Sequence, residues 1–129
     1  MYLDTSVALA HVLTEDRRPP ASFWANSFVS SRLLHYEIWT RLHRLGQSKS
    51  SGPRTRALLE VVGILEMTPE MLEPVLDGFG DSVRTLDAIH LASMTWMRDQ
   101  RMAFKLATYD KRLAAAAAKF GVEVMSPER

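Results

Sequence analysis

The sequence predicts an α/β fold with a mostly parallel sheet of four to five short strands, flanked by helices. Short apolar runs that suit strands alternate along the chain with longer segments of helical periodicity. Such alternation is typical of parallel strands joined by helical crossovers. The chain has 129 residues, of which 47% are hydrophobic and 24% charged, and this length and composition suit one domain with its own core. We therefore expect a single domain over residues 1–129.

Short apolar runs bounded by polar or turn-forming residues predict the strands. These segments are 2–4, 28–32, 64–67, 102–107 and 122–125. Each is followed or preceded by a segment with helical character, as a layered α/β fold requires.

Helical periodicity, capping residues and proline positions predict the helices. These segments are 6–13, 20–26, 33–45, 53–63, 69–76, 85–100 and 110–120. The apolar stripe of the third helix consists of Leu34, Ile38, Leu42 and Leu45. Pro53 and Pro69 suit the first turn of a helix, and the alanine run 114–118 favours the last helix. Gly121 then ends that helix as a C-terminal glycine.

Composition excludes several classes of protein. There is no cysteine, so the chain has no disulfide framework, zinc ribbon or thiol nucleophile. The apolar runs are far shorter than the roughly 18 residues that span a bilayer, and the first residues have no basic leader. The formal net charge of +1 indicates no particular partner. We expect a cytoplasmic protein that does not enter a membrane.

Carboxylates stand at the junctions between predicted strands and helices. They are Asp4, Glu37, Asp87 and Asp110. In an open parallel sheet, ligands bind beyond the carboxyl ends of the strands, so these side chains could share one crevice. Clustered carboxylates repel unless a cation neutralises them. Oxygen ligands without cysteine suit Mg²⁺ or Mn²⁺, and such an ion can activate water against a phosphodiester.

Each carboxylate also has an ordinary structural interpretation. Asp4 could end a strand in a turn, and Glu37 could pair with Arg41 one helical turn later. Asp87 could offset the helix dipole, and Asp110 could cap the following helix. The prediction of a metal site depends on all of them together.

Several segments resemble the PIN-domain family over nearly the whole chain. The opening Y-L-D-T-S resembles the family's first strand with the metal-binding Asp4, and L-D-A-I-H-L-A resembles its third acidic motif with Asp87. The stretch T-Y-D-K-R-L-A-A-A-A resembles the fourth motif with Asp110, and Glu37 with its apolar stripe resembles the second. In size and in its lack of cysteine the chain is similar to VapC-type toxins.

This resemblance implies a three-layer PIN-like fold and a ribonuclease that depends on Mg²⁺ or Mn²⁺. It implies that Asp4, Glu37, Asp87 and Asp110 bind the metal and catalyse cleavage of RNA phosphodiesters. It also implies a cognate VapB-like antitoxin, a toxin homodimer and a toxin–antitoxin hetero-oligomer, the elements of a type II toxin–antitoxin system.

Supporting roles follow for a few further residues. By the same resemblance the Ser6 hydroxyl would orient the site and Thr108 would support it, although both could be local caps. Arg84 could bind the scissile phosphate with its planar guanidinium, or it could be a surface charge. His90 shares a helical face with Asp87, and we expect it to be a packed or solvated residue.

Two other functions remain open at this point. One is a catalytically silent PIN-like module that only binds a partner or RNA. The other is a phosphatase of the haloacid-dehalogenase type with Asp4 as nucleophile. Such a phosphatase needs a second aspartate two residues later, where this chain has Ser6.

Overall fold

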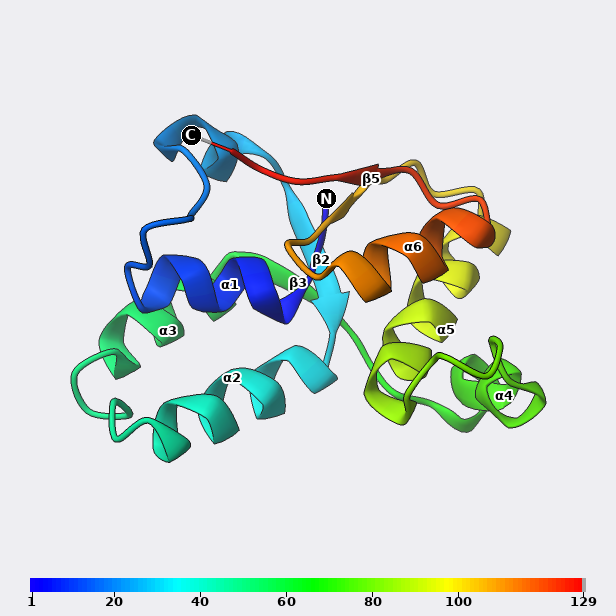
Figure 1. The fold of residues 1–129 in the computed structure, drawn as a ribbon, viewed down its shortest axis with the longest axis horizontal. Coiled ribbons are helices and arrows are strands. Elements are labelled where there is room, and N and C mark those ends of the chain that lie inside the picture. Colours follow the sequence, from blue (N-terminus) through cyan, green and yellow to red (C-terminus); the bar gives the residue numbers. More distant parts are fainter. Residues whose placement is uncertain (129) are drawn as a thin grey trace.

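Residues 1–128, the part of the chain described by the computed structural model, form a parallel sheet with helices on both faces (Figure 1). The strands are β1 (Tyr2–Leu3), β2 (Phe28–Ser31), β3 (Val62–Leu65), β4 (Leu106–Ala107) and β5 (Val124–Met125). The helices are α1 (Thr5–Val12), the 3-10 helix η1 (Ala21–Ala25), α2 (Leu33–Arg44), α3 (Gly52–Glu60), α4 (Pro69–Asp77), α5 (Thr85–Asp99) and α6 (Lys111–Lys119).

The sheet has the order β3-β2-β1-β4-β5, and all of its strand pairs are parallel. Tyr2 pairs with Val29 on one side and with Leu106 on the other, so β1 lies in the middle. The predicted α/β fold with a mostly parallel sheet of short strands is therefore confirmed. Because the strands run the same way, their carboxyl ends meet at one edge.

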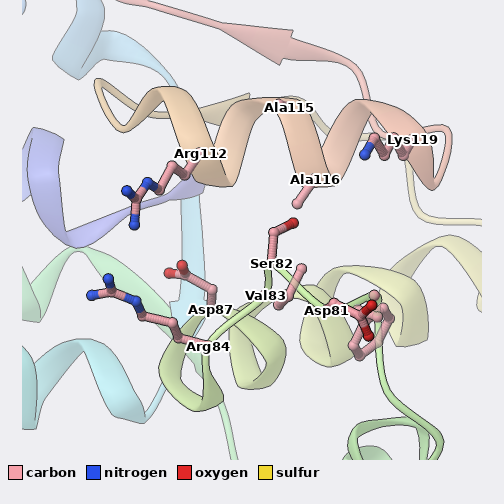
Figure 2. A pocket seen from close by; sticks show the side chains of 11 residues that line it. Asp81, Ser82, Val83, Arg84, Asp87, Arg112, Ala115, Ala116 and Lys119 are labelled. Carbon is pink, nitrogen blue, oxygen red and sulfur yellow. The ribbon is translucent and has the colours of Figure 1, made fainter.

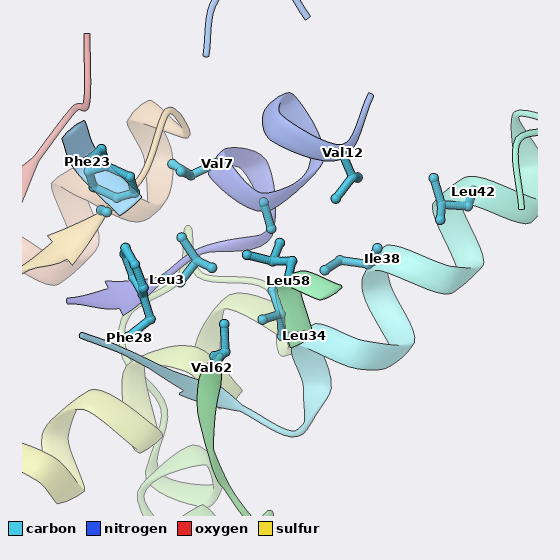
Figure 3. Close-up of a cluster of buried hydrophobic side chains, with 12 residues drawn as sticks. Leu3, Val7, Val12, Phe23, Phe28, Leu34, Ile38, Leu42, Leu58 and Val62 are labelled. Atoms are coloured by element: carbon cyan, nitrogen blue, oxygen red, sulfur yellow. The ribbon is translucent and has the colours of Figure 1, made fainter. Parts of the chain in front are cut away.

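The helices form an outer layer on each face of the sheet. In Figure 1, α1, α2 and α3 lie on one side, and α4, α5 and α6 lie on the other. Successive side chains of a strand point to opposite faces. Leu3 accordingly packs in the cluster with α1, α2 and α3 (Figure 3), whereas Tyr2 packs in the cluster with α5 and α6.

Some predicted boundaries were wrong. The strand predicted over 102–107 contains only Leu106 and Ala107, because β1 offers only Tyr2 and Leu3 as pairing partners. The strand predicted over 64–67 begins earlier, at Val62, and ends at Leu65. The helix predicted over 20–26 is a single short 3-10 segment.

The predicted apolar stripe of α2 is one residue too long. Leu34, Ile38 and Leu42 are fully buried, but Leu45 is 44% exposed. The helix ends at Arg44, and Leu45 is its C-terminal cap residue, so its side chain no longer follows the buried stripe.

Within residues 1–128, every helix is too short or too polar to cross a bilayer.

Candidate active site

A groove of about 730 Å³ lies where the central strands end. Side chains from the β1–α1 junction, α2, the start of α5 and the β4–α6 junction line it. The carboxylates predicted from the sequence all lie along this groove: Asp4, Glu37, Asp87 and Asp110. Three of these elements follow a strand. The fourth element, α5, precedes β4 and runs antiparallel to the strands. Its first turn therefore lies at the edge of the sheet where the strands end.

Asp4 is held rigidly at the end of β1. It is the N-cap of α1, and its side chain is largely withdrawn from solvent, with the residue 6% exposed. Its Oδ2 accepts hydrogen bonds from the Ser6 hydroxyl at 2.6 Å and the Thr108 hydroxyl at 2.8 Å. The Ser6 backbone N–H also donates to Oδ2, at 3.3 Å. Among the described residues nothing bonds Oδ1, so one oxygen remains available to a ligand.

Ser6 and Thr108 connect the two junctions that carry Asp4 and Asp110. The Ser6 hydroxyl accepts a hydrogen bond from the Tyr109 backbone N–H at 3.0 Å. The Thr108 hydroxyl accepts one from the Asp110 backbone N–H at 2.9 Å. Each hydroxyl thus donates to Asp4 and accepts from the loop after β4, which fixes the two carboxylates relative to each other.

Asp110 is the N-cap of α6, as the ordinary interpretation of the sequence predicted. Its Oδ1 accepts from the backbone N–H groups of Arg112 and Leu113, at 2.9 and 3.1 Å. Among residues 1–128 its Oδ2 has no hydrogen-bond donor, so capping leaves that oxygen free. Capping and ligand binding are therefore compatible for Asp110.

Glu37 belongs to a network that the sequence did not reveal. Its Oε1 accepts from the Thr5 hydroxyl at 2.8 Å and lies 2.6 Å from His90 Nε2. His90 is 1% exposed, and its Nδ1 lies 2.7 Å from the Tyr2 hydroxyl. The alternative pairing of Glu37 with Arg41 is not observed among the ion pairs of the described residues.

His90 is a packed residue, as expected, but its packing has an electrostatic function. Burial opposes a charged imidazole, yet Tyr2 and the bonded Glu37 carboxylate outweigh it and hold the pKa of His90 well above its usual range. The only hint in the sequence was the three-residue spacing from Asp87. The partners Tyr2 and Glu37 lie 88 and 53 residues away, so no local pattern could identify them.

Asp87 is repelled by the neighbouring carboxylates. Burial, followed by the charges of Asp110 and Asp4, raises its pKa, and His90 opposes this only in part. Among the described residues its side chain has no hydrogen bond or ion pair. Repulsion of this kind is relieved when a cation binds.

The donor set fits a hard divalent cation in its chemistry. Over residues 1–128, no three acidic or histidine side chains are grouped so that together they could hold one metal ion. Mg²⁺ does not require such a group, because it usually keeps several waters and takes one or two carboxylates together with substrate phosphate. Rigid Asp4 and the free oxygens of its neighbours meet that requirement.

Arg84 does not line this groove. Its exposed side chain lies at an adjacent hollow, which shares Asp87 with the groove (Figure 2). Thus Ser6 and Thr108 contact Asp4 directly, whereas Arg84 lies on the flank of the carboxylate cluster.

The chain is similar to known proteins along nearly its whole length. Two Mycobacterium tuberculosis proteins, Ribonuclease VapC47 and Ribonuclease VapC46, are 30% and 29% identical to this chain. Each alignment covers 98% of this chain and 96% or 97% of the relative.

A solved structure shows the same fold. The crystal structure of Mycobacterium tuberculosis VapC20, a Sarcin-Ricin loop cleaving toxin, superposes with a TM-score of 0.68 at 22% identity. The match covers 89% of this chain and 93% of that one. Residues 1–119 match the family model of the PIN domain, and the chain therefore belongs to the PIN-domain family.

Proposed function

We propose that this protein is a metal-dependent endoribonuclease toxin of a type II toxin–antitoxin system. The observation that supports this proposal is that Asp4, Glu37, Asp87 and Asp110 all line one groove. The proposal is also supported by the two relatives named above, which are both ribonucleases of the VapC type. The proposed reaction is hydrolysis of an RNA phosphodiester: water adds to phosphorus, and the P–O bond to the leaving oxygen breaks.

Some of the site residues are proposed to bind the metal, and others orient those ligands. Asp4, Glu37, Asp87 and Asp110 are the proposed ligands for Mg²⁺ or Mn²⁺. When bound, such an ion would supply an activated water and stabilise negative charge on the phosphodiester. Ser6 and Thr108 orient Asp4 through its Oδ2, and His90 with Thr5 orients Glu37 through its Oε1.

A protein partner is part of the same proposal. Tyr36 and Leu86 line the groove, and both are large hydrophobic residues exposed to solvent. Such a surface could pack against the apolar face of a helix from a partner. We propose a VapB-like antitoxin as this partner, with a homodimer of the toxin in the hetero-oligomer, acting in the cytoplasm where RNA is accessible. Co-purification with the product of a short neighbouring reading frame tests this part.

The phosphatase alternative loses its support. The position that needs a second aspartate holds Ser6, whose hydroxyl donates to Asp4 Oδ2, and the family is that of PIN domains. A silent binding module would not need the free carboxylate oxygens found here, and the following experiment separates it from an enzyme.

The test compares two aspartates on one helix. Asp87 lies in the first turn of α5, and the exposed Asp99 is its last residue, about 18 Å away along the helix axis. Asp87→Asn and Asp99→Asn each remove one negative charge from the same element. Cleavage of a labelled single-stranded RNA is measured with Mg²⁺, with Mn²⁺ and with excess EDTA, and Mn²⁺ binding is measured by calorimetry.

We expect Asp87→Asn to lower cleavage by more than about 100-fold and to weaken Mn²⁺ binding, with Asp99→Asn unchanged. Asp4→Asn should behave like Asp87→Asn, because amide nitrogen does not replace an anionic oxygen ligand. Cleavage that survives EDTA, or that survives both Asp4→Asn and Asp87→Asn, would contradict the proposal. Absence of Mn²⁺ binding at millimolar metal would favour the silent module.

A further inference from the structure

A second hollow opens beside the carboxylate groove. It has a volume of about 710 Å³ and lies between segment 79–84 and one face of α6 (Figure 2). This volume falls in the range of sites that bind small organic molecules. Asp87 lines both the hollow and the groove, so the two adjoin at that residue.

The hollow is lined by cations that have no ion-pair partner among the described residues. They are Arg84, Arg112 and Lys119. In Figure 2 the Asp87 side chain lies between those of Arg84 and Arg112, and Lys119 lies at the other end of α6. Guanidinium groups bind phosphate oxygens well because of their planar, forked donors.

The rest of the lining is largely apolar. Phe79, Val83, Ala115 and Ala116 contribute to it. The ring of Phe79 is fixed in place by an edge-to-face contact with Phe120, at 5.0 Å between ring centroids. An apolar wall beside unpaired cations is the combination that a nucleotide uses, since its base packs on apolar surface while its phosphate meets the cations.

We propose that this hollow binds the nucleotide next to the scissile phosphate of a single-stranded RNA, with Arg84 and Arg112 contacting the backbone and the apolar wall contacting the base. This assignment rests on the proposed function, because it places the scissile phosphate in the adjoining groove. An RNA strand lying in that groove would pass Asp87 and reach the hollow on the other side of that residue.

The acidic residues of the hollow can accept hydrogen bonds from the N–H groups of a nucleobase, which the carboxylate side chains of an acidic peptide cannot supply. Asp81 lies on the lining together with Asp87 and Ser82. Peptide carboxylates placed here would face these two acids. A nucleobase instead presents N–H donors on its edges, which carboxylate and hydroxyl oxygens can accept.

The experiment measures RNA binding without cleavage. The intact protein is titrated in EDTA against a fluorescent single-stranded oligoribonucleotide, and anisotropy is followed at several salt concentrations. The variants are Arg84→Gln and Arg112→Gln. The matched control is Arg54→Gln, an exposed arginine on α3 that does not line the hollow.

We expect Arg84→Gln and Arg112→Gln each to weaken binding about tenfold and to reduce the salt slope by about 0.7 per lost phosphate contact. Arg54→Gln should match the wild type. The uncharged variant Ala115→Trp fills the hollow. It should therefore abolish the difference between an intact oligonucleotide and one with an abasic site at the flanking position.

Two results would overturn the assignment. One is that the arginine variants bind RNA as Arg54→Gln does. The other is that a polyglutamate peptide of equal charge competes as well as RNA, which would indicate a site for an acidic protein segment.

Failure of this assignment is distinguishable from failure of the proposed function. Normal RNA affinity in the arginine variants, with cleavage still lost in Asp87→Asn, removes only the nucleotide site. RNA binding through Arg84 and Arg112 without any metal-dependent cleavage would remove the nuclease function and leave the hollow as an RNA-binding site without a scissile phosphate beside it.

Discussion

The Tyr2 hydroxyl is a small group with a large predicted effect on stability. Tyr2→Phe keeps the ring that packs at the centre of the sheet and removes only the partner of His90 Nδ1, 2.7 Å away. His90 is fully buried, so water cannot replace the lost partner. The perturbation therefore leaves one buried polar atom unsatisfied without creating a large cavity.

The expected loss of stability follows from that unsatisfied atom. A buried polar group without a partner costs about 1–3 kcal/mol. Unfolding entropy near 2.1 cal/mol/K per residue gives a fall in Tm of about 4 °C for each kcal/mol in a chain of 129 residues. Tyr2→Phe should thus lower Tm by about 4–11 °C.

Thermal and urea unfolding of the protein in EDTA measure this change without a contribution from metal. Tyr36→Phe is the matched control, because Tyr36 is 59% exposed and its hydroxyl has no partner among the described residues. A loss in Tyr2→Phe no larger than in Tyr36→Phe would refute the reasoning. Mn²⁺ affinity provides a second readout, and we expect it to fall about tenfold, because His90 no longer holds Glu37 as firmly.

Two further predictions concern packing and pH. Leu42→Ala should lower the free energy of unfolding by about 2–5 kcal/mol, whereas Leu45→Ala should lower it by less than about 0.5 kcal/mol. Urea unfolding measures both changes, and equal losses would contradict the observed end of α2. Burial and the charges of Arg54 and Arg18 lower the pKa of His11, so the unfolded chain binds more protons as pH falls below about 6.5. The free energy of unfolding of the wild type should accordingly decrease below that pH, and that of His11→Gln should decrease less. Urea unfolding at several pH values measures this, and an equal decrease in the two proteins would contradict the role given to His11.

Much of the fold was predictable because its signals are local. Alternating strand-like and helical segments indicated a parallel sheet, and a parallel sheet brings the ends of distant strands to one edge. For this reason Asp4 and Asp110 could be expected to lie near each other, although they are 106 residues apart in the sequence. The strand limits were less predictable, because β4 extends only as far as β1 pairs with it.

The details of the site depended on contacts between distant segments. His90 was expected to be packed, but only the structure shows that it joins Tyr2 to Glu37. Arg84 was a candidate for binding the scissile phosphate or for a surface charge, and the structure places it at the adjoining hollow. Neither relation has a periodicity or motif that a single sequence displays.

The sequence by itself determined the parallel α/β architecture and the carboxylates at its strand ends, since periodicity and short motifs are properties of neighbouring residues. Only the tertiary structure decided which oxygens of Asp4, Glu37 and Asp110 are bound by other described residues and that Asp87 has no such partner. That distinction arises from hydrogen bonds such as Thr108 to Asp4 and His90 to Glu37. Folding alone brings those partners within bonding distance.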